Sequence, residues 1–413
     1  MTVQVRRGDP GQPAESPVRQ GSLRLHNLAL TFRQIVAAAG VPVSRIELST
    51  STGLTRPTIS RIVEELLAGG LIVEAGPAHS GGSGRPRVGL VLSRRGPAGL
   101  GLDVRGGSLA ACVVDLTGAV RQLCFTDTVR PDADPTEVLA GLAEMAGTAI
   151  RAAAAEDLTV VGATVAVPGP VQQHSLVRFA PALGWRDVDA GALLRAAIGV
   201  PDLPVVVDNE AMLAALGELY ASHEDLRDFI CVAGELGLGA GIVLGGRLLR
   251  GARGWSGELG HVTVAADGPP CRCGANGCLQ GYASIEAILA AAGQPPAQGT
   301  PVAGIVALAD AGSPAVLAAL DRAGTALGTA LASTINVLDV GVVLLGGSYS
   351  LLASWLSSNI VAQLHRRVLS AAWAPVEVRP AQLGPDAAVI GAALTAIDEV
   401  RHNPGTWLGR TRR

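Results

Sequence analysis

Three of the six cysteines in this 413-residue chain lie within eight residues, at Cys271, Cys273 and Cys278, and His261 comes ten positions before the first of them. Three thiolates and one imidazole form the soft tetrahedral donor set of a closed structural zinc site, which leaves no position for a catalytic water. A disulfide within the group would leave one thiol over. The alternative is a set of buried free thiols, the state expected for the other three cysteines: Cys112, Cys124 and Cys231. The group therefore predicts a structural Zn²⁺ ion.

The length and composition indicate a multidomain α/β protein. A chain of 413 residues is too long for one hydrophobic core and predicts two or three domains. The sequence is 48% hydrophobic and only 3% aromatic, with 53 glycines, which is typical of an Ala/Val/Leu/Gly-rich α/β fold. No run of about eighteen uncharged apolar residues occurs, and the first twenty residues lack the apolar middle of a signal peptide. We expect a cytoplasmic protein without membrane contact.

Charge is distributed unevenly along the chain. Residues 1–100 contain twelve Arg, no Lys and six acidic side chains, a net charge of +6, whereas the remainder has a net charge of −9. A solvated surface with a basic tail would explain this pattern. The sharper interpretation is an N-terminal module that binds nucleic acid.

The periodicity of the basic segment predicts three helices. The apolar spacing favours an amphipathic helix over residues 23–40 and a short second helix over residues 44–53. Ser44 and Glu47 have the spacing of a capping box at the start of the second helix. The third helix begins at Thr55, has Pro57 in its first turn and presents one apolar face. A helix, a glycine turn and another helix give the spacing of a helix-turn-helix.

The segment that follows predicts a wing. Residues 71–75 and 88–92 can pair as two strands around a loop that carries two arginines. If the third helix enters a major groove, its first turn faces bases and phosphates, and the wing reaches a neighbouring groove or the backbone. Each side chain singly could be a solvated surface residue, but the ordered set favours DNA contact. The predicted DNA-contact residues are Ser44, Arg45, Thr55, Arg56, Thr58, Ser60, Arg61, Arg85 and Arg87.

From Leu100 onward the sequence predicts apolar strands that are separated by glycines. LGLDVRGGSLAACVVDLTG predicts a β-hairpin, and GELGHVTVAADGPPCRCGANGCLQ contains a Glu-x-Gly-His followed by Cys-x-Cys-Gly-x-x-Gly-Cys. With these motifs and the predicted helix-turn-helix and wing, the chain from about Ser22 to Val400 resembles the ROK family, named for repressors, open reading frames and kinases. The segment SRIELSTSTGLTRPTISRIVEELLAGGLIVE and the loop GGSGRPR resemble the DNA-binding head and wing of the family's regulators.

The resemblance implies a fold and a division of the chain. The fold is α/β, with an N-terminal winged helix-turn-helix before a two-lobed actin-like, sugar-kinase-like (ribonuclease H-like) body. We predict a disordered tail at residues 1–20, a DNA-binding domain at 21–95 and a body at 96–413. The lobes are expected at about 96–205 plus the C-terminal helix and at 206–385.

The resemblance also implies a sugar pocket. In the family the Glu and His of Glu-x-Gly-His meet sugar hydroxyls, so a metal on one nitrogen of His261 would orient the other. Ala182 replaces the Asn of the family's Asn-Leu-Gly-Trp, and Gln280 replaces a Glu. A common hexose would therefore lose two polar contacts, and a modified sugar, a larger glycoside or a sugar phosphate held by Arg105 stays open. The implied ligand residues are Asn209, Glu210, Glu258, His261, Gly184, Trp185 and Gln280.

The parts that a sugar kinase requires have changed. The family's Glu-Asn-Asp-Ala-Asn, with the Asp as base, is matched by DNEAM, which places Glu210 at the base position. The extra methylene moves the carboxylate by about an ångström, a displacement that can cost roughly a hundredfold in rate. Arg105 occupies a glycine position in the first phosphate loop, and Glu235 would place a carboxylate near the phosphates in the second. We expect no catalytic residue to be retained.

These observations favour a transcriptional regulator, expected to be a repressor, that binds operator DNA and senses a carbohydrate through a degenerate sugar-kinase body. One alternative is a regulator that retains ATP-dependent sugar kinase activity. Another is a regulator that binds no sugar. DNA-binding heads of this kind generally act as two-fold dimers on half-sites roughly 34 Å apart, so we expect a homodimer or a dimer of dimers.

Overall fold

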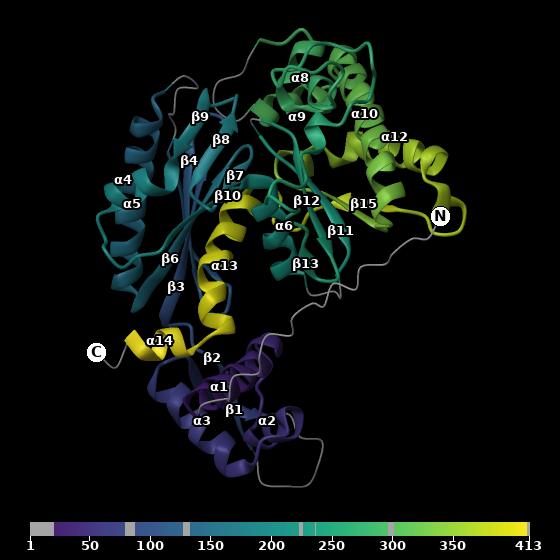
Figure 1. Cartoon of the computed structure of the whole chain (residues 1–413). Coiled ribbons are helices and arrows are strands. Elements are labelled where there is room, and N and C mark those ends of the chain that lie inside the picture. Colours follow the sequence, from purple (N-terminus) through teal and green to yellow (C-terminus); the bar gives the residue numbers. More distant parts are fainter. Residues whose placement is uncertain are drawn as a thin grey trace, which may run out of the picture. The chain divides into compact units, whose positions relative to one another are not determined.

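The computed structural model describes residues 20–78, 87–126, 133–222, 226–235, 237–295 and 301–410. The chain divides into two compact units (Figure 1), the head, Met1–Leu92 with Val400–Arg413, and the body, Ser93–Glu399. The tail predicted for residues 1–20 lies outside the described residues except for Gln20, which begins the first helix. The last residues, 400–413, belong to the head, whereas the division predicted from the sequence placed them in the body.

The head has the predicted helix-turn-helix and wing strands. The helices are α1 (Gln20–Ala37), α2 (Arg45–Thr52) and α3 (Arg56–Ala68). They are followed by the antiparallel strands β1 (Ile72–Ala78) and β2 (Arg87–Leu92). Large apolar side chains of all three helices are buried: Leu28, Phe32, Ile35, Leu48, Ile59 and Leu66.

Local sequence sets the ends of α2 and the start of α3. The Ser44 hydroxyl accepts a hydrogen bond from the Glu47 amide, and the Glu47 carboxylate accepts one of 2.7 Å from the Ser44 amide. This reciprocal arrangement is the predicted capping box. Gly53 ends α2 in the left-handed conformation at φ 73°, which glycine adopts without strain. Thr55 caps α3 and accepts from the Thr58 amide.

A C-terminal helix completes the head. In α14 (Gly405–Arg410), the Trp407 indole N–H donates a 2.8 Å hydrogen bond to the carbonyl of Gly69, at the end of α3. Leu408 lies so close that a Cβ built on Gly69 would be 2.0 Å from its Cδ2. The side chains of Trp407 and Leu408 are both buried. The head core is therefore built from two segments separated by the whole body in sequence.

Within its described residues, the body has two five-stranded sheets and a smaller three-stranded one, β7-β8-β9. The first large sheet has the order β10-β6-β3-β4-β5, and the predicted hairpin is its β3–β4 pair. Strand β6 pairs in parallel with β3 on one side and with β10 on the other. The strands are β3 (Gly96–Val104), β4 (Leu109–Asp115), β5 (Val120–Thr126), β6 (Leu158–Val167), β7 (Val171–Gln172), β8 (Leu176–Ala180), β9 (Trp185–Asp189) and β10 (Val205–Asn209).

Helices cover both faces of the first sheet. Leu100 and Leu102 of β3 pack in one core with α4 (Pro135–Ala155) and α5 (Ala190–Ile198), and Figure 1 shows these helices together on one side. The alternate residues Gly99 and Gly101 face α13 (Ala387–His402). A Cβ at either glycine would lie about 2 Å from an α13 carbonyl, at 2.1 and 2.0 Å respectively. These glycines therefore permit close packing of helix on strand.

The second large sheet has the order β13-β12-β11-β14-β15. Its strands are β11 (Phe229–Ala233), β12 (Gly239–Leu244), β13 (Arg247–Leu248), β14 (Val342–Leu345) and β15 (Glu377–Pro380). Helix α6 (Glu210–Ala221) packs on one face through Ala215, and α10 (Pro314–Leu338) and α12 (Ala353–Arg367) pack on the other. The remaining elements are α7 (Gln280–Ala283), α8 (Ile285–Ala291), α9 (Pro301–Asp310), α11 (Ser348–Leu351) and the 3-10 turns η1 (Leu259–His261), η2 (Leu369–Ala372) and η3 (Gly384–Asp386).

Two helices, α4 and α10, have the length and apolar content of a membrane span. Within their most apolar windows, 44% and 61% of the residues are buried inside the protein. Each helix packs an apolar face on one of the two large sheets. Their apolar content is thus accounted for by the cores that they form.

Candidate functional site

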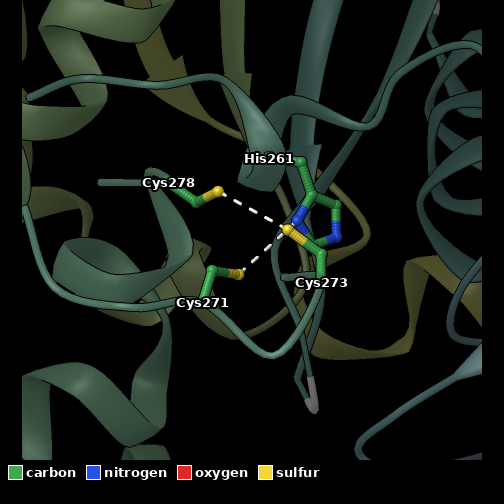
Figure 2. A group of neighbouring side chains, drawn as sticks. All are labelled: His261, Cys271, Cys273 and Cys278. Atoms are coloured by element: carbon green, nitrogen blue, oxygen red, sulfur yellow. Dashed lines mark hydrogen bonds between the residues drawn. The ribbon is translucent and has the colours of Figure 1, made fainter. Parts of the chain in front are cut away.

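The predicted metal ligands come together in the body. The donor atoms of His261, Cys271, Cys273 and Cys278 all lie within 4.8 Å of one another (Figure 2). Cys271 Sγ is 3.8 Å from His261 Nδ1, and Cys273 Sγ is 3.7 Å from Cys278 Sγ. Soft thiolate and imidazole donors in one tight cluster fit a tetrahedral metal ion.

A tight turn presents two of these thiols. The Cys271 amide donates a 2.7 Å hydrogen bond to the Ala275 carbonyl, and Gly274 has φ 96°. At Gly277 (φ 67°) a Cβ would lie 1.6 Å from the Ala265 carbonyl oxygen. The glycines of the Cys-x-Cys-Gly-x-x-Gly-Cys motif therefore shape the loop that gathers the sulfur atoms.

His261 joins the cluster to a cavity. Its Nδ1 faces Cys271, whereas its Nε2 lies 3.9 Å from a carboxylate oxygen of Glu258. Both residues line a cavity of about 290 Å³. Burial raises the pKa of Glu258 and lowers the pKa of His261. A metal on Nδ1 would leave Nε2 directed at whatever occupies the cavity.

Five of the seven predicted ligand residues line this cavity, which we call the sugar cavity after that prediction: Asn209, Glu210, Glu258, His261 and Gln280. Trp185 and Gly184 are not among the residues that line it. The Trp185 side chain is 1% exposed within the core of the first sheet, and Gly184 forms a turn at φ 67°.

Two of the lining residues also form hydrogen bonds that support the surrounding structure. The Asn209 side-chain oxygen accepts hydrogen bonds from the Ala211 and Met212 amides and caps α6. The side-chain nitrogen of Gln280 donates a 3.5 Å hydrogen bond to Cys271 Sγ. Gln280 thus connects the sugar cavity to the sulfur cluster, where an amide donor suits a thiolate better than a carboxylate would.

A second cavity, of about 370 Å³, is lined by Arg105 and Glu235, the two residues predicted from the sequence to lie in the phosphate loops. The turn after β3 contributes Arg105 and Gly107, the loop after β11 contributes Glu235, and the loop after β14 contributes Gly347. Glu210 lines both cavities. We call this second cavity the acidic cleft, since its carboxyl groups are Asp103, Glu210 and Glu235.

The positive charge of Arg105 is already paired. Arg105 Nε donates a 2.8 Å hydrogen bond to Asp103, and Nη2 donates one of 3.0 Å to Asp386, which lies in η3. The guanidinium also lies 5.1 Å from the centre of the Phe125 ring. Two carboxylates and a ring leave this side chain little capacity to hold a further anion.

The carboxyl groups of the acidic cleft are buried and close to one another. Burial, together with the charges of Asp103 and Glu235, raises the pKa of Glu210 to about 8. Burial and Asp103 also raise the pKa of Glu235, whose carboxylate accepts a hydrogen bond from the Gly106 amide. Asp103 Oδ1 finds no hydrogen-bond partner among the residues that the structure describes.

Comparison with known proteins identifies the family. The ROK family model matches residues 99–399. The chain belongs to the ROK family. The xylose repressor of Bacillus subtilis (strain 168) is 29% identical over 373 residues, which are 90% of this chain and 95% of that protein.

Solved structures support the same assignment. A crystal structure of a ROK family transcriptional regulator, a homologue of the E. coli MLC protein, has a TM-score of 0.76 and 28% identity, with 94% of this chain and 99% of that chain covered. A ROK family glucokinase from Streptomyces griseus, solved with glucose and AMPPNP, has a TM-score of 0.62 and 29% identity, with 73% of this ROK chain and 99% of that chain covered.

The predicted DNA-contact residues of this ROK protein differ in their exposure and in the interactions that they already form within the protein. Arg56 and Arg61 are exposed on α3. The Thr55 and Thr58 hydroxyls lie 2.9 Å apart, and Ser60 is half-buried on the same helix.

The remaining predicted contacts lie outside α3. Ser44 is buried and engaged in its capping box, and Arg45 forms a 3.1 Å ion pair with Glu74. Arg87 begins β2, and Arg85 lies outside the described residues.

Several residues that line the cavities of the ROK protein were not predicted from the sequence. Phe179, Arg272 and Glu286 line the sugar cavity, and Arg272 forms a 2.7 Å ion pair with Glu286 at its edge. Arg272 could have been suspected, since it stands between two metal-ligand cysteines. Asp386 gave no local signal, because it pairs with Arg105 across 281 positions.

Proposed function

We propose that this ROK protein is a transcriptional repressor that binds operator DNA through its head. Binding of a sugar in the body would change its affinity for the DNA. The observation that carries the proposal is the set of three helices, α1 to α3, followed by the two paired wing strands β1 and β2. The regulator structure covers 94% of the chain, whereas the glucokinase structure covers 73%. The proposed DNA contacts are the exposed Arg56 and Arg61, together with Thr58, Ser60 and the wing arginines Arg85 and Arg87.

The metal of the cluster is proposed to be Zn²⁺. Its role would be structural, because four protein donors leave no open position. The ion would hold the ring of His261, so that Nε2 and the neighbouring Glu258 can meet sugar hydroxyls. Folding of the loop would be coupled to metal binding.

The sugar is proposed to be a neutral monosaccharide of about the size of xylose. The cavity of about 290 Å³ lies at the small end of ligand sites. A sugar phosphate fits poorly, because Arg272 is paired with Glu286 and the cavity wall carries the carboxyl groups of Glu210 and Glu258. The relatives named xylose repressors favour the same ligand size.

Kinase activity is proposed to be lost. At pH 7 a carboxyl group with a pKa of about 8 is mostly protonated and cannot accept a proton from a sugar hydroxyl. The acidic cleft would repel ATP, since the only basic side chain among its described lining residues, Arg105, is already bound to two carboxylates. Turnover in a coupled assay with ATP and a sugar panel would contradict this part.

The central experiment is binding of fluorescent DNA from the gene's own upstream region, repeated with D-xylose, D-glucose and other neutral sugars. We expect one sugar to change the DNA affinity at least tenfold. Glu258→Gln should abolish the sugar response and retain DNA binding, whereas Arg61→Ala should weaken DNA binding and retain sugar binding in thermal-shift measurements. Glu144→Gln, on the exposed face of α4, is the matched control. Equal DNA binding by Arg61→Ala and the parent would contradict the proposed surface.

The remaining features of the proposal are its location and its assembly. We propose a cytoplasmic homodimer or dimer of dimers, since operator half-sites about one helical turn apart require two heads. Light scattering of the purified protein, alone and with operator DNA, tests the assembly. A monomer on a single half-site would contradict it.

A further inference from the structure

We propose that Trp255 is a positioning residue of the sugar cavity. Trp255 is not among the described residues that line the cavity, but its side chain joins two of the cavity's walls to each other. This inference rests on the proposed sugar site and adds a residue to it. The observation that carries it is one hydrogen bond between segments 84 positions apart, each of which continues directly into one wall.

The first wall is the segment of residues 168–170, between β6 and β7, and all three of these residues line the cavity. Gly169 has φ 88°, and a Cβ there would lie 2.1 Å from the Phe179 carbonyl oxygen, so the segment lies against β8. The Asn209 side-chain nitrogen donates a 3.1 Å hydrogen bond to the Gly169 carbonyl. Val171 comes next and is buried in the core of the first large sheet. The first wall therefore belongs to the half of the body that is built on that sheet.

The second wall carries Glu258 and is attached to the second large sheet. The chain reaches Glu258 through residues 249–257, which we call the strap. Both ends of the strap are bonded to β12. The Leu249 amide donates a 2.7 Å hydrogen bond to a carbonyl of that strand, and the Gly257 carbonyl accepts one of 2.8 Å from an amide of the same strand. Since Glu258 follows directly, the strap determines where this residue lies.

Between its two ends the strap reaches the other half of the body. Trp255 Nε1 donates a 2.9 Å hydrogen bond to the Val171 carbonyl. Arg250 Nη2 donates one of 2.8 Å to the carboxylate of Asp208, in β10. Trp255 is half-buried, and the guanidinium of Arg253 lies 5.9 Å from the centre of its ring. The strap is thus bonded to both halves of the body, and the indole N–H makes the connection beside the first wall.

A sugar must contact both walls at once to be held between them. Trp255 lies three positions before Glu258, and Val171 follows Pro170 directly. The indole hydrogen bond therefore fixes the spacing between Glu258 and the first wall. If the walls part for some of the time, the apparent dissociation constant rises in inverse proportion to the fraction of molecules with the correct spacing. Loss of this one hydrogen bond should weaken sugar binding roughly threefold to tenfold.

Trp255→Phe tests the proposal, because it keeps an aromatic ring and removes the N–H donor. Isothermal titration calorimetry of the full-length protein with D-xylose and with D-glucose measures sugar affinity. Hydrogen–deuterium exchange of the sugar-free protein measures the opening of residues 168–172 and 255–261. We expect roughly threefold to tenfold weaker sugar binding and faster exchange in both segments, while the sugar-free variant binds operator DNA as the parent does. Trp373→Phe, the same change at a residue that is 72% exposed, should leave both measurements unchanged.

Two results would overturn the proposal. Equal sugar affinity in Trp255→Phe and the parent would show that the indole does not position the site. Unchanged exchange in both segments would show that other contacts hold the walls together. If Trp255→Phe does not fold, Trp255→Leu, which also lacks the donor, takes its place in both measurements. A parent protein that binds neither sugar would count against the proposed sugar instead, and the exchange measurement, which needs no ligand, would still decide whether Trp255 joins the walls.

Discussion

Arg105 Nη2 lies 3.0 Å from the carboxylate of Asp386, so that the turn between β3 and β4 is tied to the residue that precedes α13. The same guanidinium satisfies one oxygen of the buried Asp103. One guanidinium therefore binds two carboxyl groups that are 283 positions apart in the chain. In a kinase this turn would receive phosphate, and here it is filled by an internal ion-pair network.

Removal of that arginine should destabilise the body. Arg105→Met leaves Asp103 buried without its partner, and a broken buried ion pair typically costs about 3–5 kcal/mol. The loss should be smaller at pH 5 than at pH 8, because Asp103 can then be protonated. Urea unfolding at both pH values measures it. Arg178→Met removes an exposed pair with Asp187 and should cost about 1 kcal/mol or less; an equal loss in the two variants would contradict the network.

Metal removal should unfold the cysteine loop. Cys271→Ser or Cys273→Ser removes one of four donors, and we expect a protein with less than half of the parental zinc by elemental analysis and a lower Tm. Cys124→Ser is the control, since that cysteine belongs to β5 and has no part in the cluster. Zinc content equal to that of the parent in both ligand variants would rule out a metal at these residues.

Stability should fall with rising pH because of Glu210. Its pKa is about 8 in the folded protein and 4.5 in the reference state. The folded state therefore binds the proton more tightly, and this contribution is complete below about pH 4.5 and is lost progressively as the pH rises to about 8. Glu210→Gln cannot ionise and should flatten this part of the profile. Urea unfolding of parent and variant between pH 5 and 8.5 makes the comparison; parallel profiles would refute it.

The contact of Trp407 with Gly69 should matter for DNA binding. Trp407 is 8% exposed, and truncation of a buried tryptophan typically costs about 3–5 kcal/mol. We expect Trp407→Ala to unfold the head at lower urea concentration, as followed by circular dichroism, and to weaken operator binding. Trp373→Ala, at a residue 72% exposed, should change stability by about 0.5 kcal/mol or less. Operator affinity unaffected by Trp407→Ala would argue against this support.

Short-range patterns allowed part of this molecule to be predicted. The capping box of Ser44 and Glu47, the end of α2 at Gly53 and the strands of the wing all depend on residues that are neighbours in the chain. The Cys3His cluster was also predictable, because donor chemistry and spacing within eighteen residues are enough to define it. Such features need no knowledge of the tertiary fold.

Long-range packing could not be predicted in the same way. The glycines of β3 were interpreted from the sequence as strand and turn punctuation, whereas Gly99 and Gly101 allow α13 to approach the sheet. The placement of α14 in the head depends on a hydrogen bond across 338 positions, and no periodicity signals it. The burial of Trp185 likewise depends on which neighbours the first sheet supplies.

The joining of α14 to the end of α3 also has a consequence for biosynthesis. A ribosome makes residues 20–92 first, then the whole body, and reaches Gly405 only near the end of the described chain. A nascent or prematurely terminated polypeptide can thus possess the metal loop and both cavities and still lack the last piece of its DNA-binding core. Under the proposed function, the competence to occupy an operator would be acquired only when translation has passed Leu408.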